Sequence, residues 1–200
     1  MGNGEKLRLQ SIIRGCSKNK VDTEHVLAQV QDAYDICGEE DCGAGFVDVA
    51  LVNTCGFIGD AKEESVNTIL EVAERKKAGR VGKIVVFGCL SQRYASELPD
   101  LIPEVDIWLG ARDNDEVVRA LGVTPMPERG QSRFVTEGSG SYAYLKISEG
   151  CSHHCTFCII PDLRGDLVLL RDSLHPWGSS FCSDGKACGG SRESCGNWSA

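Results

Sequence analysis

The sequence predicts an α/β fold in which an open parallel sheet carries helices on both faces. Short apolar runs alternate with helical periods up to about residue 121. Pro and Gly then interrupt every period over residues 122–140, and a new apolar run opens residues 141–168. Strands that alternate with helices form parallel sheets covered on both faces. We therefore expect a domain at 1–121, a linker at 122–140 and the start of a second α/β unit at 141–168.

Apolar runs bounded by turn residues predict the strands, because a short strand buried on both faces is continuous in apolar residues. These runs are 7–13, 47–52, 83–88, 105–110 and 141–148. The first is weakened by Arg8 and Gln10. The last leads directly into a loop rich in cysteine, an order typical of a strand followed by a ligand loop.

Apolar residues three and four apart predict the helices. We expect one helix at 22–37, a short helix after the strand at 83–88, and one near 113–121. Asp60 and Glu63 have the spacing of a capping box ahead of a further helix. The stripe of the helix at 22–37 is Val26, Leu27, Val30, Ala33, Tyr34 and Cys37. The stripe after the capping box is Val66, Ile69, Leu70 and Ala73.

Composition and charge narrow the functional class. The chain has 200 residues, is 42% hydrophobic and carries a net charge of −8. This charge disfavours a nucleic-acid footprint and suits a basic partner better. The start of the chain lacks a signal-like apolar run, and no stretch is long enough to span a membrane. We therefore expect a cytoplasmic protein with no membrane partner, whose eleven cysteines are reduced rather than bridged.

Three cysteines share one position in the predicted sheet. Cys16, Cys55 and Cys89 each follow a predicted strand and begin the turn to a helix. Ligands of open α/β sheets bind outside the carboxyl ends of the strands, and neighbouring strands lie only about 4.8 Å apart. Three thiolates could therefore meet on one small centre, and the flanking Gly15, Gly56 and Gly88 would permit close approach. The alternative is simple burial, since free cysteine is a common core residue.

The remaining cysteines of the first domain lack that placement. Cys37 lies on the helical stripe, which predicts a core position, and Cys42 lies in the polar loop GEEDCGAG. We expect neither to be a ligand.

A second set, Cys151, Cys155 and Cys158, has the spacing C-x3-C-x2-C. A zinc site would need His153 or His154 as a fourth ligand, but a histidine between two nearby cysteines is poorly placed to close a tetrahedron. Soft thiolates also select iron–sulfur clusters, and a 4Fe–4S cluster normally takes four. With three cysteines, one iron is left to bind another group. We refer to residues 151–158 as the cysteine loop.

These motifs resemble a known family. The pattern C-x3-C-x-aromatic-C, with Phe157 as the aromatic, resembles the signature of radical S-adenosylmethionine enzymes. The segments GCSKNKVDTEHVL, VNTCGFI, GCLSQRY and YLKISEGCSHHCTFCIIPDLRGDL together resemble the methylthiotransferases of that superfamily, in the branch that modifies a ribosomal protein. The resemblance covers about residues 6–168 and comprises four separated motifs in order.

The resemblance implies two 4Fe–4S clusters and S-adenosylmethionine as cofactors. One cluster would be held by Cys16, Cys55 and Cys89, and the other by Cys151, Cys155 and Cys158. Phe157 would lie near the bound nucleoside. The implied reaction adds a methylthio group to the β-carbon of an aspartate in a small-subunit ribosomal protein, and an electron donor reduces the cluster. Such a carbon has no useful acidity, so the chemistry is carried by cofactors.

Two alternatives remain. The related enzymes that methylthiolate an adenosine in tRNA differ around the second cysteine, and the acidic charge makes tRNA a poor partner for this chain. A non-catalytic iron–sulfur or zinc-binding fragment belongs to another class. It is favoured by residues 169–200, a divergent tail rich in Gly, Ser and Cys for which we expect disorder. Since only the first strand and ligand loop of a (β/α) barrel precede this tail, we expect the chain as given to be an incomplete, inactive form.

Overall fold

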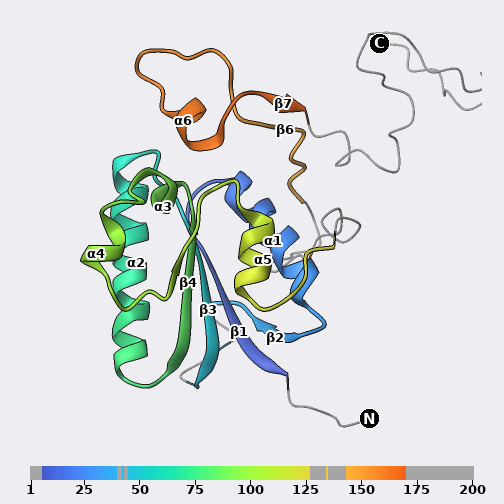
Figure 1. Ribbon diagram of the computed structural model, residues 1–200, viewed down its shortest axis with the longest axis vertical. Coiled ribbons are helices and arrows are strands. Elements are labelled where there is room, and N and C mark those ends of the chain that lie inside the picture. Colours follow the sequence, from blue (N-terminus) through green and yellow to red (C-terminus); the bar gives the residue numbers. More distant parts are fainter. Residues whose placement is uncertain (1–5, 40–41, 43–44, 127–133, 135–142, 170–200) are drawn as a thin grey trace, which may run out of the picture.

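The computed structural model describes residues 6–39, 42, 45–126, 134 and 143–169 (Figure 1). Its main sheet has the strand order β2-β1-β3-β4-β5, and every pairing in it is parallel. The strands are β1 (Leu7–Ile13), β2 (Tyr34–Cys37), β3 (Val47–Thr54), β4 (Val81–Gly88) and β5 (Ile107–Trp108). The predicted open parallel sheet is therefore confirmed.

Helices cover both faces of this sheet, as predicted. They are α1 (Ser17–Val30), α2 (Gly59–Lys77), α3 (Cys89–Arg93), α4 (Leu98–Leu101) and α5 (Asn114–Ala120). Figure 1 shows α1 and α5 on one face, and α2, α3 and α4 on the other.

Alternate residues of the central strands supply two hydrophobic layers, because successive side chains of a strand point to opposite faces. Val52 of β3 packs in the cluster that contains Ile69 of α2, whereas Leu51 packs in the cluster that contains Leu27 of α1. All four side chains are fully buried. Burying such a side chain contributes about 1.5–3 kcal/mol, so these layers hold the helices against the sheet.

The helix predicted at 22–37 is wrong at both ends. Helix α1 begins at Ser17 and ends at Val30, and residues 34–37 form β2, which pairs with β1 from Leu7 to Gln10. Tyr34 is buried as predicted, but as a strand residue whose hydroxyl donates to the carbonyl oxygen of Leu121 at 2.6 Å. A four-residue strand is too short for its own period to compete with a helical pattern, and its pairing with β1 decides its structure.

The expected capping box also fails. The N-cap of α2 is Ile58, and Asp60 lies inside the first turn, where its carboxylate favours the positive end of the helix. Ile69 and Ala73 are buried as predicted, but Leu70 is 45% exposed and Val72 is buried in its place. The helix is therefore rotated relative to the predicted stripe.

Cys37 and Cys42 form a disulfide, with their Cα atoms 5.5 Å apart. This contradicts the expectation that the cysteines are unpaired. The polar loop also did not indicate the burial of Cys42, which is 3% exposed and belongs to the core cluster on the α2 face. The bridge joins the end of β2 to the following loop.

The strand predicted at 141–148 is wrong for its described part. Residues 143–147 have no regular structure, and only β6 (Ser148–Glu149) is a strand. It pairs antiparallel with β7 (Val168–Leu169). The cysteine loop and α6 (Ile160–Arg164) lie between these two strands, whose pairing holds the ends of the segment 148–169 together. A strand forms where a partner strand is available, and among the described residues the only partner for this segment is the two-residue strand β7. The barrel opening that we expected here is not confirmed.

Most of the predicted linker, and all of the predicted tail except Leu169, lie outside the described residues. Within the described part of the chain, no helix is both long and apolar enough to cross a membrane.

Asp106, just before β5, ties that edge of the sheet to α2. Its carboxylate accepts from Lys76 Nζ at 2.6 Å and from the backbone N–H of the buried Ile84 at 2.7 Å. Partial burial opposes ionisation of Asp106, but these hydrogen bonds and the Lys76 charge outweigh it and lower the carboxyl pKa.

We expect Asp106→Ala to lower the free energy of unfolding by about 1–3 kcal/mol, because the Ile84 N–H loses its acceptor. Asp106→Asn keeps an acceptor and should lose less than about 1 kcal/mol. Because the folded-state pKa of Asp106 is lowered, ionised Asp106 stabilises the fold at pH values above the unfolded-state pKa near 4. This stabilisation is lost as the pH falls through the folded-state pKa. Urea unfolding at pH 7 and pH 3 should therefore show the Asn variant approaching the wild type at pH 3. A gap as large at pH 3 as at pH 7 would contradict the ionic role.

Candidate functional site

Cys16, Cys55 and Cys89 lie at the carboxyl ends of three adjacent parallel strands, as predicted. Cys16 follows β1 and is the N-cap of α1. Cys55 comes directly after β3, and Cys89 follows β4 as the first residue of α3. Strands β1, β3 and β4 are neighbours in the sheet. We call this edge, defined by the three cysteines, the thiol edge.

Two glycines bring the turns of the thiol edge together. Gly15 has φ +103°, and a Cβ built on it would lie 2.6 Å from Cys55 Cβ. A Cβ on Gly56 would lie 2.6 Å from the carbonyl oxygen of Cys89. Real side chains do not tolerate such distances, so glycine is needed at both positions. The predicted close approach of backbone at these glycines is confirmed.

The three thiols differ in their surroundings. Cys55 and Cys89 are each 6% exposed, whereas Cys16 is exposed. Cys16 Sγ donates to Asn19 Oδ1 at 3.6 Å, and Cys89 Sγ accepts from Arg164 Nε at 3.2 Å. Burial raises the pKa of the Cys89 thiol, the Arg164 charge opposes this, and the nearby sulfurs of Cys55 and Cys16 raise it further. The surroundings of Cys89 therefore oppose its thiolate form, apart from the charge of Arg164.

The three thiols lie at one edge of the sheet, but the side chains described there are not arranged as a complete metal site. Among the described residues, no group of three or more His, Cys, Asp or Glu side chains is arranged to hold a metal ion. The donor set still fits a cluster, because three soft thiolates at one edge are the ligands that iron–sulfur centres take, and two of the three are shielded from water. In this structure, Asn19 and Arg164 make the hydrogen bonds of two of the sulfurs instead.

Buried amides hold the backbone of the thiol edge. Asn19 Nδ2 donates to the carbonyl oxygens of Arg14 and Thr54 and to Asn53 Oδ1, at 2.9–3.1 Å. Asn53 Nδ2 donates in return to the carbonyl oxygen of Asn19 and to Thr23 Oγ1, both at 2.9 Å. These contacts join the end of β3 to the first turns of α1. Sequence analysis missed both asparagines, although each lies within three residues of a predicted ligand.

The cysteine loop is partly open to solvent. Cys151 and Cys158 are partly exposed, and Cys155 is exposed. The Cys151 N–H donates to the carbonyl oxygen of Gly165 at 2.9 Å, which closes the base of the loop. His154 has φ +45°, an uncommon left-handed conformation, and its Nε2 lies 3.5 Å from Asp166 Oδ1. Phe157, expected near a nucleoside, is 91% exposed, so its ring is available for contact.

Helix α6, which follows the cysteine loop, packs on the thiol edge. Leu163 of α6 forms a small buried cluster with Cys89 and Ala111, and Ile159 lies against it. Figure 1 shows α6 and the β6–β7 pair beyond the ends of the sheet strands. The structure thus brings the segment after the second cysteine set onto the edge that carries the first.

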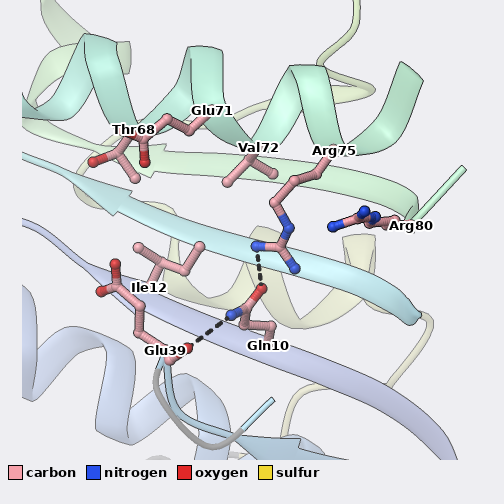
Figure 2. A pocket seen from close by; sticks show the side chains of 8 residues that line it. All are labelled: Gln10, Ile12, Glu39, Thr68, Glu71, Val72, Arg75 and Arg80. Carbon is pink, nitrogen blue, oxygen red and sulfur yellow. Dashed lines mark hydrogen bonds between the residues drawn. The ribbon is translucent and has the colours of Figure 1, made fainter. Parts of the chain in front are cut away.

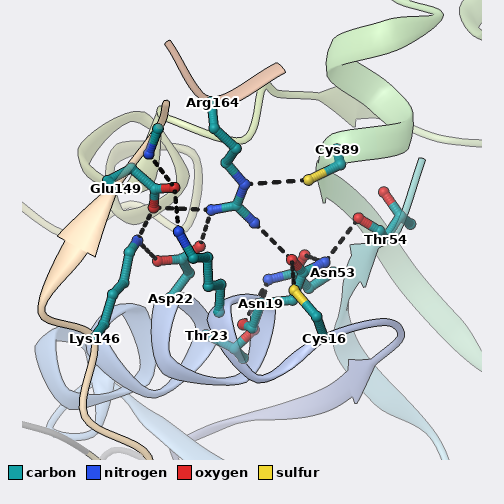
Figure 3. A network of polar contacts seen from close by, with 12 residues as sticks. Cys16, Asn19, Asp22, Thr23, Asn53, Thr54, Cys89, Lys146, Glu149 and Arg164 are labelled. Atoms are coloured by element: carbon teal, nitrogen blue, oxygen red, sulfur yellow. Dashed lines mark hydrogen bonds and ion pairs between the residues drawn. The ribbon is translucent and has the colours of Figure 1, made fainter. Parts of the chain in front are cut away.

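Four charged side chains fix this arrangement, and we call them the charge cluster (Figure 3). They are Asp22 of α1, Lys146, Glu149 of β6 and Arg164 of α6. Arg164 Nη1 lies 2.6 Å from Asp22 Oδ2 and 3.2 Å from Glu149 Oε2, and Lys146 pairs with both carboxylates. Their side chains are only 2–15% exposed. The sequence did not predict the cluster, because no local pattern identifies Asp22 as a partner of Lys146 and Arg164, which lie more than 120 positions away along the chain.

The electrostatics of the charge cluster favour the ionised forms of Glu149 and Arg164. Burial alone would raise the pKa of Glu149, but Lys146 and Arg164 lower it overall. Burial likewise opposes the charged form of Arg164, yet Asp22, Cys89 and Glu149 raise its pKa. The opposite charges around Glu149 and Arg164 therefore favour the ionised forms of these two side chains.

A cavity of about 380 Å³ lies elsewhere, between α2 and the face of β1 (Figure 2). Its polar lining is joined internally, since Arg75 donates to Gln10 at 2.8 Å and Gln10 donates to the carbonyl oxygen of Glu39 at 3.3 Å. None of the predicted cysteine ligands lines it. It therefore has no part in the site at the thiol edge.

Comparison with known proteins gives consistent matches. A family model described as "Uncharacterized protein family UPF0004" matches residues 8–110. The chain is 45% identical over 166 residues to ribosomal protein uS12 methylthiotransferase RimO of Porphyromonas gingivalis, covering 79% of this chain and 36% of that protein. The protein of the same name from Bacteroides thetaiotaomicron is 46% identical over 162 residues, covering 80% and 36%. That from Clostridium kluyveri is 41% identical over 175 residues, covering 80% and 38%. The chain thus spans little more than a third of the length of these relatives.

Asn19→Ala tests how the thiol edge is held. It removes the donor of three hydrogen bonds inside a fully buried network, so we expect a loss of at least about 2 kcal/mol in the free energy of unfolding. Asn67→Ala, at an exposed position of α2, is the control and should change it by less than about 0.5 kcal/mol. Equal losses from the two variants in urea unfolding would show that the amide network does not hold this edge.

Proposed function

We propose that this chain, which belongs to the uncharacterized protein family UPF0004, takes part in the methylthiolation of the small-subunit ribosomal protein uS12. One observation carries the proposal. Three cysteines end three adjacent parallel strands, and the segment after the second cysteine set packs on the same edge. The 41–46% identity to relatives named for this activity supports it.

In this proposal Cys16, Cys55 and Cys89 hold one 4Fe–4S cluster, and Cys151, Cys155 and Cys158 hold the other. Each set has three thiolates, which leaves one ligand position open for a second group. When bound, the clusters and S-adenosylmethionine supply the radical and the sulfur chemistry that attaches a methylthio group to an aspartate β-carbon.

The residues of the chain supply placement and surroundings. Burial of Cys55 and Cys89 keeps water from two of the three sulfurs at the thiol edge. Arg164 places a positive charge beside Cys89, where thiolate charge would gather. The exposed ring of Phe157 stands between Cys155 and Cys158 along the chain, where an adenosyl group bound at the cysteine loop could stack on it.

The ligand assignment predicts iron contents. The full chain, purified without oxygen and reconstituted with iron and sulfide, should bind about eight irons, the content of two 4Fe–4S clusters. Cys16→Ala, Cys55→Ala and Cys89→Ala should each lose about half of this. Cys37→Ala is the matched control and should lose none, because Cys37 lies on β2 in a pair with Cys42. Equal iron loss from the Cys37 variant would mean that the ligands are wrongly assigned.

The substrate assignment is tested in a chimera. Residues 1–168 of this chain would replace the matching segment of the Bacteroides thetaiotaomicron relative. With S-adenosylmethionine and dithionite, we expect mass spectrometry to find methylthio-aspartate in uS12 and no modification of tRNA. The same chimera with Cys55→Ala should form no product. A methylthio group on tRNA adenosine would reverse the substrate assignment, and an inactive chimera that binds both clusters would contradict the proposed function.

A further inference from the structure

Arg164 is the buried side chain through which the two cysteine-bearing parts of the chain meet. Its guanidinium contacts Asp22 and Asn19 of α1, Glu149 of β6 and Cys89 of α3 (Figure 3). It is 4% exposed. Arg164 thus links α6 to α3 and α1, whose contact residues Cys89 and Asn19 lie 75 and 145 residues away along the chain.

The same guanidinium reaches two sulfurs of the thiol edge. Its Nε donates directly to Cys89 Sγ at 3.2 Å. Its Nη2 donates at 2.6 Å to Asn19 Oδ1, the atom that also accepts from Cys16 Sγ at 3.6 Å. The polar path therefore runs from Cys16 through Asn19 and Arg164 to Cys89. Groups that bond to metal-ligating atoms in this way orient them and commonly change metal affinity 10–100-fold.

These contacts need the geometry of arginine. The guanidinium is a planar fork whose nitrogens point in fixed, different directions, so it can bind a carboxylate, an amide oxygen and a sulfur at once. A lysine ammonium is a point charge at the end of a flexible stem. Lysine at 164 could stay near Asp22 and Glu149 but could not also reach both Asn19 and Cys89.

We propose that Arg164 is a positioning residue of the thiol edge, which fixes the sulfurs of Cys89 and Cys16 and holds the cysteine loop over them. The inference rests on the proposed function only in taking these sulfurs as cluster ligands. The contacts themselves are hydrogen bonds between side chains of this chain. Through Arg164, the placement of one cysteine set depends on the placement of the other.

The test measures thiol reactivity in the metal-free full chain. A pulse of iodoacetamide on chelator-treated protein, followed by peptide mass spectrometry, gives separate alkylation rates for Cys89 and Cys55. Cys55 is the internal reference, because it is equally buried and no described hydrogen bond joins it to Arg164. In Arg164→Gln we expect Cys89 to react about tenfold faster while Cys55 changes less than about twofold. Loss of a nearby positive charge alone would slow alkylation by disfavouring the thiolate, so acceleration reports a released sulfur.

Arg119→Gln is the matched control, an exposed arginine whose ion-pair partner within the described part of the chain is Glu116 on its own helix, and it should change neither rate. Unchanged Cys89 reactivity in Arg164→Gln would overturn the proposal. If alkylation of both thiols accelerates equally, α6 has detached from the thiol edge or the variant is misfolded. The variant Arg164→Lys then distinguishes the proposal from these two outcomes. This variant keeps the positive charge. Selective acceleration of Cys89 alkylation in it supports the proposal, whereas an equal change in the alkylation rates of Cys89 and Cys55 overturns it. Absence of iron binding at the thiol edge would instead refute the proposed function, and the alkylation result would stand by itself.

Discussion

The arrangement of the two cysteine sets depends on a buried guanidinium placed between two carboxylates. Burying charged groups is costly unless each is paired and hydrogen-bonded. The charge cluster meets this condition, because Asp22 and Glu149 each contact both Arg164 and Lys146. Removing Arg164 would leave the two buried carboxylates with Lys146 as their shared partner and with less positive charge around them. Ion pairs that join three separate parts of the chain therefore help to give the segment 148–169 one defined position despite its short strands.

Sheet topology explains why the first cysteine set lies where it does. The order β2-β1-β3-β4-β5 reverses direction between β1 and β3, and crevices at such a reversal are the ligand sites of open α/β sheets. Cys16 and Cys55 end the two strands that flank this point. Gly15 and Gly56 then remove the side chains that would otherwise separate the turns. The fold itself thus creates the position, and the cysteines give it a chemistry.

The parts of the fold that could be predicted are those set by local pattern. Strands β3 and β4 contain long apolar runs and β1 a weaker one, so the strand ends, and with them the positions of Cys16, Cys55 and Cys89, follow from sequence. Strand β2 could not be predicted, because four residues with helical spacing become a strand only by pairing with β1. The Arg164 contacts could not be predicted either. Asp22 and Arg164 are 142 residues apart, and either could have been an ordinary surface charge. Tertiary pairing decided both cases.

Charge gives the same edge a further physical role. In the proposed function, three thiolates around a cluster would carry net negative charge into a site where Cys55 and Cys89 are shielded from water. A low-dielectric site stabilises such charge only if a positive group or aligned donors are nearby. Arg164 meets this need, with Lys146 balancing the two carboxylates on its other side. If Arg164 were neutral or absent, the carboxylates of Asp22 and Glu149 would face the thiolates across the same edge. The guanidinium therefore separates two groups of like charge, and this separation makes the joint placement of α1, α3 and α6 compatible with a thiolate site.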